Sequence, residues 1–293
     1  MNEEINESNS VFILKTVQIQ PIKCIFSALK EIMTDINIKI TKEKITIAHV
    51  GQNHQTYVNA VLNEKSFQKY HCEFDLINVI IPSQFFFKII STMSNSDTLT
   101  LFIKKEDYEN NFGNVCVKNF GFRYENGGTG EIFETTVRSV DEESNELHND
   151  NAFENGVLDY NTKISTPSGD FQSIVKRLAS FEIKRIRIES QQESVQFKGI
   201  GSTTCKDPTF TRIENEKSFK FDKKPTLKST INIGEYDVKT LLQFIKCTPL
   251  CESMEIFIQT DKPIIMKYKI GSLGHIYLLC ANKENVSSYE EDE

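Results

Sequence analysis

The hydrophobic positions of this chain form mainly short runs of strand length, some alternating with polar positions and some continuous. Such runs predict β-strands, because successive side chains of a strand point to opposite faces of a sheet. In the first half the runs cover residues 11–18, 36–41, 45–50, 57–62, 98–104, 115–118 and 132–140. In the second half they cover residues 183–190, 194–200, 203–213, 254–259, 264–270 and 274–281.

Four segments instead repeat their apolar residues with the spacing of an α-helix. They cover residues 21–33, 83–92, 168–180 and 235–247. Pro21 and Pro82 stand at or just before a first helical turn, and Pro249 follows the last segment, where it favours a helix end. We therefore expect four helices, each with an apolar face directed at a sheet.

The order of the predicted elements repeats along the chain. A strand, a helix, several strands, a second helix and further strands occur before about residue 140 and again after about residue 160. Corresponding helices lie roughly 150 residues apart, about one domain length. The repeat predicts an α+β fold of two similar domains.

The segment 141–155 is acidic, rich in asparagine and poor in large apolar residues, which favours an extended, exposed linker. The first ten residues are also acidic and polar, unlike a signal or transit peptide. We expect a disordered leader at 1–10, an N-terminal domain at 11–140, a connector at 141–160, a C-terminal domain at 161–283 and an acidic tail at 284–293.

The composition is that of a soluble globular protein, with 39% hydrophobic and 26% charged residues among 293. No apolar run is long enough to span a membrane, and we expect an intracellular protein. Seven cysteines, an odd number, are scattered over the chain, which favours reduced thiols over a disulfide framework.

Basic residues concentrate on the polar faces of the four predicted helices, although the chain has a net charge of −7. One helix with a few lysines is the ordinary solvated kind, but four such helices in an acidic chain indicate a surface for phosphate groups. These residues are Lys23, Lys30, Lys88, Lys176, Arg177, Lys239 and Lys246. No platform of aromatic residues and arginine accompanies them, so we expect loose contact with a duplex without reading of bases.

The chain contains no motif that predicts catalysis, a cofactor or a metal. Gly127, Gly128 and Gly130 follow an asparagine and precede a strand, which predicts a turn rather than a phosphate-binding loop. Cys247 and Cys251 form a lone pair without further ligands, which favours a structural role over zinc. We therefore expect no catalytic residues, no cofactor and no metal site.

Several segments resemble those of the proliferating cell nuclear antigen (PCNA) family of sliding clamps. In the first half these are SALKEI at 27–32, FQKYHCE at 67–73, and FKIIS followed by NSDTLTL. In the second half they are TPSGDFQSIVKRLAS at 166–180 and the block 245–283, with the acidic end 289–293. The most specific is the block 245–283, which combines K-x-T-P-L, D-x-P, YKI and G-H in order. The resemblance covers roughly residues 11–283.

The resemblance implies a fold of two domains in which pairs of helices lie across antiparallel sheets. Three chains would close head to tail into a ring lined by the helices, and the basic residues named above match its inner surface. Closure would pair the edge strand around 132–140 with the edge strand around 203–213 of the next chain. A pocket for a short helical partner motif would be lined by Val50, His54, Gln55, Tyr57, Tyr160, Pro263, Leu279, Cys280 and Ala281.

The implied function is a sliding clamp, which encircles double-stranded DNA without regard to sequence and acts as a homotrimer. Its partners would be DNA polymerase, the clamp loader and other proteins with clamp-interacting motifs, in the nucleus or in the replication compartment of a large DNA virus. Two alternatives remain: a subunit of a heterotrimeric checkpoint clamp, and a viral processivity factor that forms no ring.

The chain departs from the family pattern at several places. The connector lacks the family's Leu-Gly-Ile-Pro segment, Asn282 replaces a typical proline, and Leu279 replaces a common aromatic residue. Gln191 or Gln192 stands where the family has a lysine that becomes modified, and the stretch 107–130 is longer than usual. These differences indicate a divergent clamp.

Overall fold

The computed structural model describes residues 5–51, 55–111, 114–139, 159–201, 208–216, 219–227 and 229–283. The chain divides into two compact units. Unit 1 comprises residues 1–49, 59–146 and 270–275, and unit 2 comprises residues 50–58, 147–269 and 276–293. In the described part, no helix is both long and apolar enough to cross a membrane.

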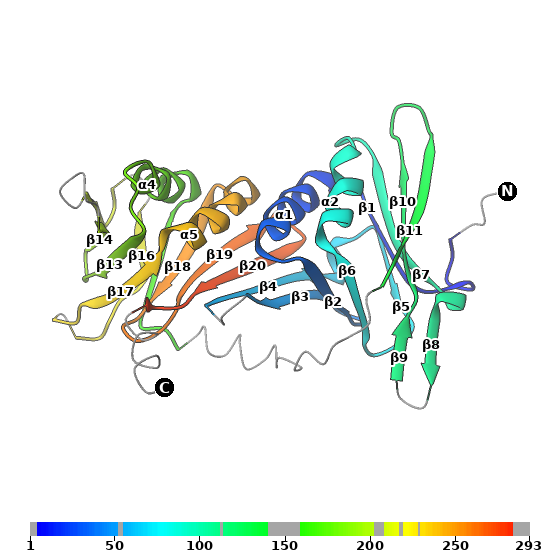
Figure 1. Cartoon of the computed structure of the whole chain (residues 1–293), viewed down its shortest axis with the longest axis horizontal. Helices are drawn as coiled ribbons and strands as arrows, with labels where there is room; N and C mark the ends of the chain where they lie inside the picture. Colours follow the sequence, from blue (N-terminus) through cyan, green and yellow to red (C-terminus); the bar gives the residue numbers. More distant parts are fainter. Residues whose placement is uncertain are drawn as a thin grey trace. The chain divides into compact units, whose positions relative to one another are not determined.

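Unit 1 contains two helices and two runs of antiparallel strands (Figure 1). The helices are α1 (Ile19–Ile32) and α2 (Ser83–Thr92). One run has the order β11-β10-β7-β1-β5, with β1 (Ser10–Thr16), β5 (Lys69–Cys72), β7 (Thr98–Lys104), β10 (Asn119–Glu125) and β11 (Ile132–Arg138). The other has the order β4-β3-β2-β6, with β2 (Asp35–Ile40), β3 (Lys44–Val50), β4 (Thr56–Asn63) and β6 (Ile77–Pro82).

Unit 2 repeats this plan with helices α4 (Ser168–Ser180) and α5 (Val238–Phe244). One run has the order β20-β19-β18-β12-β16, with β12 (Thr162–Pro167), β16 (Lys220–Lys223), β18 (Ser253–Ile258), β19 (Ile264–Ile270) and β20 (Gly274–Cys280). The other has the order β15-β14-β13-β17, with β13 (Arg185–Ser190), β14 (Ser194–Ile200), β15 (Thr209–Ile213) and β17 (Asn232–Asp237). The predicted fold, two similar α+β domains with two helices each, is therefore confirmed.

The repeat extends to the pairing of individual residues. In unit 1 Ile40 pairs with Ile45 across β2 and β3, and in unit 2 Ser190 pairs with Val195 across β13 and β14. Both pairs keep the same spacing, so residues of β3 and β14 correspond with a constant offset. The first helix follows the first strand of each unit, and the second helix follows β6 in unit 1 and β17 in unit 2.

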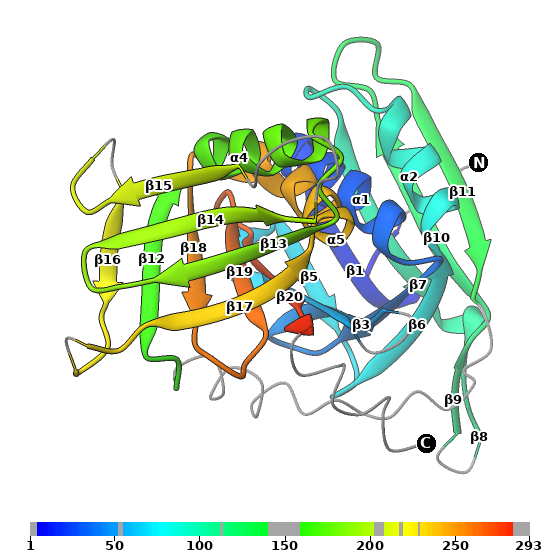
Figure 2. The same cartoon turned by 60° about the vertical axis from the view of Figure 1, so that its left-hand side comes forward.

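The helices of each unit pack side by side on one face of its strands (Figures 1 and 2). In unit 1 the rings of Phe26 on α1 and Phe86 on α2 stack with centroids 3.8 Å apart, and Phe122 of β10 meets Phe86 edge-on at 4.9 Å. In unit 2 Phe171 of α4 packs against Phe197 of β14 at 6.0 Å. Aromatic contacts therefore join helices to sheet in both cores.

The fourth helix differs from its prediction, which covered residues 235–247. Residues 235–237 end strand β17, and the Asp237 side chain accepts a hydrogen bond of 2.9 Å from the Thr240 backbone N–H, which caps α5. A 3₁₀ helix, η4 (Ile245–Leu250), then continues the helical path and includes Pro249. Because of this cap, α5 begins three residues later than predicted. Pro249 lies inside η4 instead of following the end of the helical segment.

Unit 1 carries an additional hairpin between β7 and β10, which has no counterpart between β18 and β19 of unit 2. After the short 3₁₀ helix η3 (Lys105–Asp107), strands β8 (Tyr108–Asn111) and β9 (Asn114–Val117) pair with each other (Figure 1). The Tyr108 ring stacks on Phe74 with centroids 4.4 Å apart. This hairpin occupies much of the stretch 107–130, which the sequence predicts to be longer than usual for the family.

Two smaller predictions fall on described residues and can be compared with the structure. The turn predicted at Gly127, Gly128 and Gly130 is confirmed, because the Asn126 side chain accepts hydrogen bonds from the N–H groups of Gly128 and Thr129 at 2.9 Å. The described part of the predicted leader forms a turn around Asn6 instead of an irregular segment, and Glu7 pairs with Lys69 at 3.2 Å. The predicted connector up to residue 158 and the tail at 284–293 lie outside the described residues.

Candidate functional site

Two of the three basic side chains on the helices of unit 1 contact other residues of the same unit. Lys23 of α1 donates a hydrogen bond to the backbone carbonyl of Met93. Lys30 lies over the Phe87 ring, with Nζ 3.6 Å from the ring centroid, and 3.8 Å from a Glu31 oxygen. Lys88 of α2 is exposed, and none of the described residues forms an ion pair with it.

The helical segments of unit 2 present their cations to solvent. The side chains of these residues are exposed and form no ion pair or hydrogen bond with any described residue: Lys176, Arg177, Lys239 and Lys246. The buried face of α4 carries Phe171, Ile174, Val175 and Leu178, so the lysine and arginine of this helix lie on its other side.

The helical segments α1, α2, α4, α5 and η4 together contain seven basic residues and two acidic ones, Glu31 and Asp170. The whole chain has the opposite balance, with 34 basic and 41 acidic residues. Solvated helices drawn at random from this composition would carry more acid than base. The segregation favours contact with an anionic backbone through charge alone.

A second candidate site is a cluster of aromatic and aliphatic side chains in unit 2. Tyr160, Phe257, Ile265 and Tyr277 are each less than 10% exposed, and the half-buried Leu279 packs against them. The Tyr160 hydroxyl donates a hydrogen bond of 2.8 Å to the Pro263 carbonyl, which fixes its ring, and burial raises the pKa of Tyr160. Leu279 is therefore an apolar side chain presented to solvent on a rigid base.

Lysine side chains lie over the rings of this cluster. Nζ of Lys262 is 5.0 Å from the Tyr160 ring centroid, and Nζ of Lys267 is 5.2 Å from that of Tyr277. Glu255 neutralises Lys267 at 3.6 Å, whereas Lys262 forms no ion pair with the described carboxylates. The rim of the cluster is therefore basic beside Tyr160.

The structure brings most of the predicted pocket residues into unit 2. The Ala281 backbone N–H donates a hydrogen bond of 2.8 Å to the Gln55 carbonyl, and Lys283 donates to the Gln55 side chain. Val50 and Tyr57 are half-buried, as is Pro263, while His54 lies outside the described residues.

Cys280 was predicted to line the pocket, but its side chain points away from the cluster around Tyr160. Along β20, Tyr277 and Leu279 point to one face, and Ile276, Leu278 and Cys280 point to the buried face. Cys280 is only 2% exposed, and burial raises its pKa to about 12, so its thiol is protonated and inert.

Sequence reasoning missed three members of the cluster: Phe257, Ile265 and Tyr277. Strand periodicity contains a signal for Tyr277, which lies two positions before Leu279 on the same face of β20. Phe257 and Ile265 are direct partners across β18 and β19, a relation that local spacing does not reveal.

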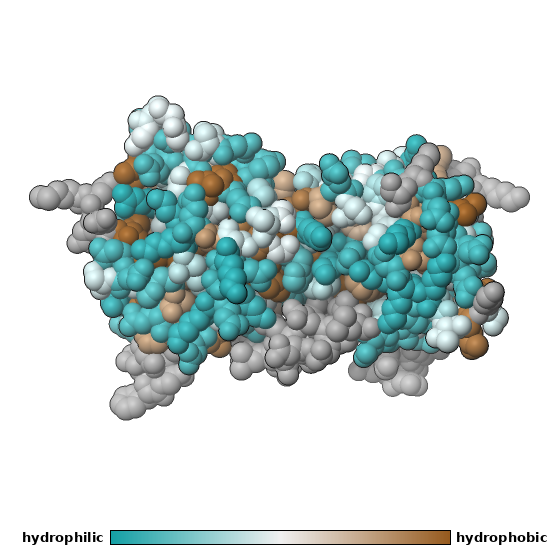
Figure 3. All heavy atoms as spheres, turned by 180° about the vertical axis from the view of Figure 1, so that it is seen from behind, coloured by the Kyte–Doolittle hydropathy of each residue, from teal (hydrophilic) through white to brown (hydrophobic). Residues whose placement is uncertain are grey.

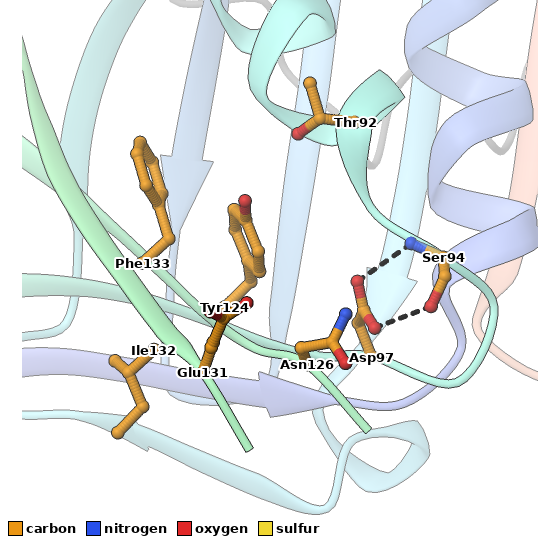
Figure 4. A pocket seen from close by; sticks show the side chains of 8 residues that line it. All are labelled: Thr92, Ser94, Asp97, Tyr124, Asn126, Glu131, Ile132 and Phe133. Atoms are coloured by element: carbon orange, nitrogen blue, oxygen red, sulfur yellow. Dashed lines mark hydrogen bonds between the residues drawn. The ribbon is translucent and has the colours of Figure 1, made fainter. Parts of the chain in front are cut away.

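A cavity of about 420 Å³ lies in unit 1 beside strand β11 (Figure 4). Its wall includes Asp97, which is 2% exposed and accepts hydrogen bonds from the Ser94 N–H (2.8 Å), the Ser94 hydroxyl (2.5 Å) and the Gly127 N–H (3.3 Å). Burial opposes ionisation of Asp97, but these hydrogen bonds outweigh it and hold its pKa below the ordinary value.

Other chemistry has little support in the described part of the chain. No group of three or more His, Cys, Asp or Glu side chains there could hold a metal ion. The six described cysteines are free thiols. Figure 3 shows a face that is mainly hydrophilic, with hydrophobic residues in small separate spots.

Two copies of one α+β unit, each with a helix pair on antiparallel strands, define the class of the protein as a DNA sliding clamp. Residues 11–123 match the family model "Proliferating cell nuclear antigen, N-terminal domain", and residues 156–283 match its C-terminal counterpart. The chain belongs to the PCNA family. Its role is that of a sliding clamp, and clamps of this family are non-enzymatic scaffolds.

Relatives of similar sequence cover nearly the whole chain, and a solved structure shares its fold. The proliferating cell nuclear antigen of Dictyostelium discoideum is 23% identical, with 93% of this chain and 99% of the relative covered. A probable DNA polymerase sliding clamp of Paramecium bursaria Chlorella virus 1 is also 23% identical, with 94% and 98% covered. The crystal structure of the Entamoeba histolytica protein superposes with a TM-score of 0.76 at 18% identity, covering 94% of this chain and 99% of that one.

Proposed function

We propose that three copies of this chain close into a ring around duplex DNA and tether a polymerase and other replication or repair proteins to it. The observation that carries the proposal is the concentration of basic residues on the helices of a duplicated unit in an otherwise acidic chain. Encirclement keeps the clamp on DNA without strong attraction, so weak contacts that salt screens are sufficient and permit sliding.

Ring closure uses the free edges of the two sheets. In the described residues β11 pairs only with β10, and β15 pairs only with β14. Exposed apolar side chains lie on both edges: Ile132 and Phe133 are 42% and 44% exposed on β11, and Ile213 is 47% exposed on β15. Unpaired edges with apolar residues favour pairing with another chain. A head-to-tail contact of this kind generates a closed ring.

Partner proteins dock at the cluster around Tyr160 in unit 2. Leu279, Tyr57, Pro263 and Ala281 form the accessible surface above a base of Phe257, Ile265 and Tyr277. A short helical motif with aliphatic and aromatic anchors suits such a surface. Cys280 supports this surface from the buried face of β20.

Solution molar mass tests the ring. Three chains of 33.7 kDa give a mass of about 101 kDa, which light scattering should find for the chain alone at micromolar concentration. A mass of one chain would overturn self-closure and favour a heterotrimeric checkpoint clamp or a factor that forms no ring.

Topology tests the function. Clamp assembled on a nicked circular plasmid should stay bound through a high-salt gel filtration step and should leave after one restriction cut. Clamp that remains on the cut DNA would contradict encirclement and would indicate binding through one basic face. The expected site of action is the nucleus or a viral replication compartment.

A further inference from the structure

The cavity beside β11 contains negative charge that the described part of the chain leaves largely unneutralised. Its wall is formed by the end of α2 with Ser94, by Asp97, and by the β10–β11 hairpin with Tyr124, Glu131 and Phe133 (Figure 4). Glu131 is exposed, and among the described residues its carboxylate accepts a single hydrogen bond, of 3.3 Å from the Thr129 hydroxyl. Lys23 also acts on Asp97 electrostatically, but it donates to the Met93 carbonyl.

The cavity lies on the helix side of β11. On this strand Val137 points into the core and is 6% exposed, so Phe133, four positions earlier, shares its face. The Phe133 ring stacks on Tyr124 with centroids 5.0 Å apart. Glu131, directly before the strand begins at Ile132, continues the same face toward α2.

Arg212 holds the matching position on the other free edge. It lies on β15, where Nη2 is 3.2 Å from an Asp170 oxygen on helix α4, so its side chain points to the helix side. The guanidinium is partly exposed and has five N–H donors, of which one carboxylate engages at most two. Arg212 can therefore bind a second carboxylate without releasing Asp170.

The internal repeat indicates how these two edges meet. Strands β4 and β20 hold the positions of β15 and β11 in the repeat. Within unit 1 the Asn63 N–H donates a hydrogen bond of 2.9 Å to the Leu273 carbonyl, and within unit 2 the Ala281 N–H donates to the Gln55 carbonyl at 2.8 Å. The end of β4 is thus bonded to the residue before β20, in antiparallel order.

Transferred to the free edges, this arrangement brings the end of β15 to the start of β11. Asn63 corresponds to Ile213, since each closes the hairpin that begins at Lys44 in unit 1 and at Ser194 in unit 2. Because Asn63 lies opposite Leu273, Leu62, the counterpart of Arg212, lies opposite Gly274, on the face of β20 that Ile276 and Leu278 bury. Glu131 is the counterpart of Gly274, since it lies at the start of its strand on the face that Val137 buries. Arg212 of one chain then lies next to Glu131 of another, on the shared helix face.

We propose that the cavity beside β11 is the docking site for the Arg212 side chain of a second copy of this chain, with Glu131 as its carboxylate partner. The proposal rests on the ring proposed above and specifies its interface. Arg212 joins Asp170 of its own chain to Glu131 of the neighbour, while Phe133 and Tyr124 cover the guanidinium from water. A guanidinium between two carboxylates and an aromatic face is a favourable arrangement for arginine.

A charge exchange tests the contact. Because Arg212→Glu would face Asp170 in its own chain, all variants contain Asp170→Asn. In that background Glu131→Arg alone and Arg212→Glu alone are each expected to raise the subunit dissociation constant at least tenfold, measured by mass photometry on dilution. The double exchange should bring the constant back to within about threefold of the background.

The matched control is Glu134→Arg, which changes the same charge on the opposite face of β11, where Glu134 lies 3.9 Å from Arg123. Arg212→Glu should not rescue it. A background protein that forms rings, with single effects that merely add, would overturn the Arg212 contact and leave the ring intact. Protein that is monomeric before any exchange at 131 or 212, with or without Asp170→Asn, would overturn the ring itself. Circular dichroism spectra that match the background exclude misfolding as the cause.

Discussion

Asp97 offers a direct test of how the hairpin that carries edge strand β11 is held in place. Its carboxylate joins the segment after α2, through Ser94, to the turn between β10 and β11, through Gly127. Hydrogen bonds to a charged group contribute about 1.5–3 kcal/mol each, but the Gly127 contact is long and water in the cavity can replace part of what is lost. We therefore expect Asp97→Ala to destabilise the hairpin by about 2 kcal/mol.

Hydrogen exchange measures this locally, because the hairpin can open without global unfolding. A loss of about 2 kcal/mol corresponds to roughly 30-fold faster amide exchange in peptides that cover residues 119–138. Asp97→Asn keeps one acceptor oxygen, so its amide exchange rate should lie between those of the unaltered protein and Asp97→Ala. Asn95→Ala, at an exposed neighbouring position, is the matched control and should exchange like the unaltered protein. Exchange within threefold of the unaltered protein for Asp97→Ala would refute the reasoning.

The same contact predicts a pH dependence with a definite sign. The pKa of Asp97 in the folded chain lies below its ordinary value of 3.8. A carboxylate with a lowered folded pKa stabilises the fold fully above its unfolded pKa and loses that contribution as the pH falls through the folded pKa. The difference between the unaltered protein and Asp97→Ala should therefore stay constant above about pH 5 and shrink below pH 4.

Two further predictions concern the candidate surfaces. Charge reversal of four exposed helix residues should reduce polymerase stimulation severalfold and leave the ring mass unchanged, because these cations have no structural partner among the described residues. The four are Lys88, Lys176, Lys239 and Lys246. Reversal of Lys23 and Lys30 alone should instead lower the melting temperature, and unchanged stimulation by the fourfold variant would contradict the DNA-facing assignment. The double substitution Leu279→Ala with Tyr57→Ala should lower the affinity for a clamp-interacting peptide at least tenfold in calorimetry without dissociating the ring. Unchanged affinity would show that the pocket lies elsewhere.

Elements with strong local signals were predictable from the sequence. Helices α2 and α4 begin and end at the predicted residues, since a proline precedes each and apolar residues recur at helical spacing within. Strand β17 was assigned to a helix in part, because its sequence NIGEYD has low strand propensity. Its fit depends on Gly234, where a Cβ atom would lie 2.2 Å from the Tyr236 hydroxyl. A close contact of this kind between neighbours on one strand has no counterpart in hydrophobic periodicity.

The candidate surfaces were predictable in kind but not in detail. Helical spacing placed Lys23, Lys30 and Lys88 on polar faces, yet it gave no sign that Met93 and Phe87 would engage the first two. These contacts join α1 to residues 70 and 57 positions later in the chain, so they depend on tertiary packing. The cluster beneath Leu279 likewise combines four separate segments of unit 2.

The unequal charge of the two units has a consequence for symmetry. The repeat of the fold would give a ring of three chains a sixfold outline, but unit 1 offers one exposed helix cation and unit 2 offers four. In the proposed ring, the cations that are free to reach a duplex would therefore alternate between strong and weak sectors with threefold symmetry. A duplex narrower than the opening has its lowest energy against a strong sector rather than on the axis. As the clamp rotates along the DNA, the duplex would pass between three equivalent resting positions.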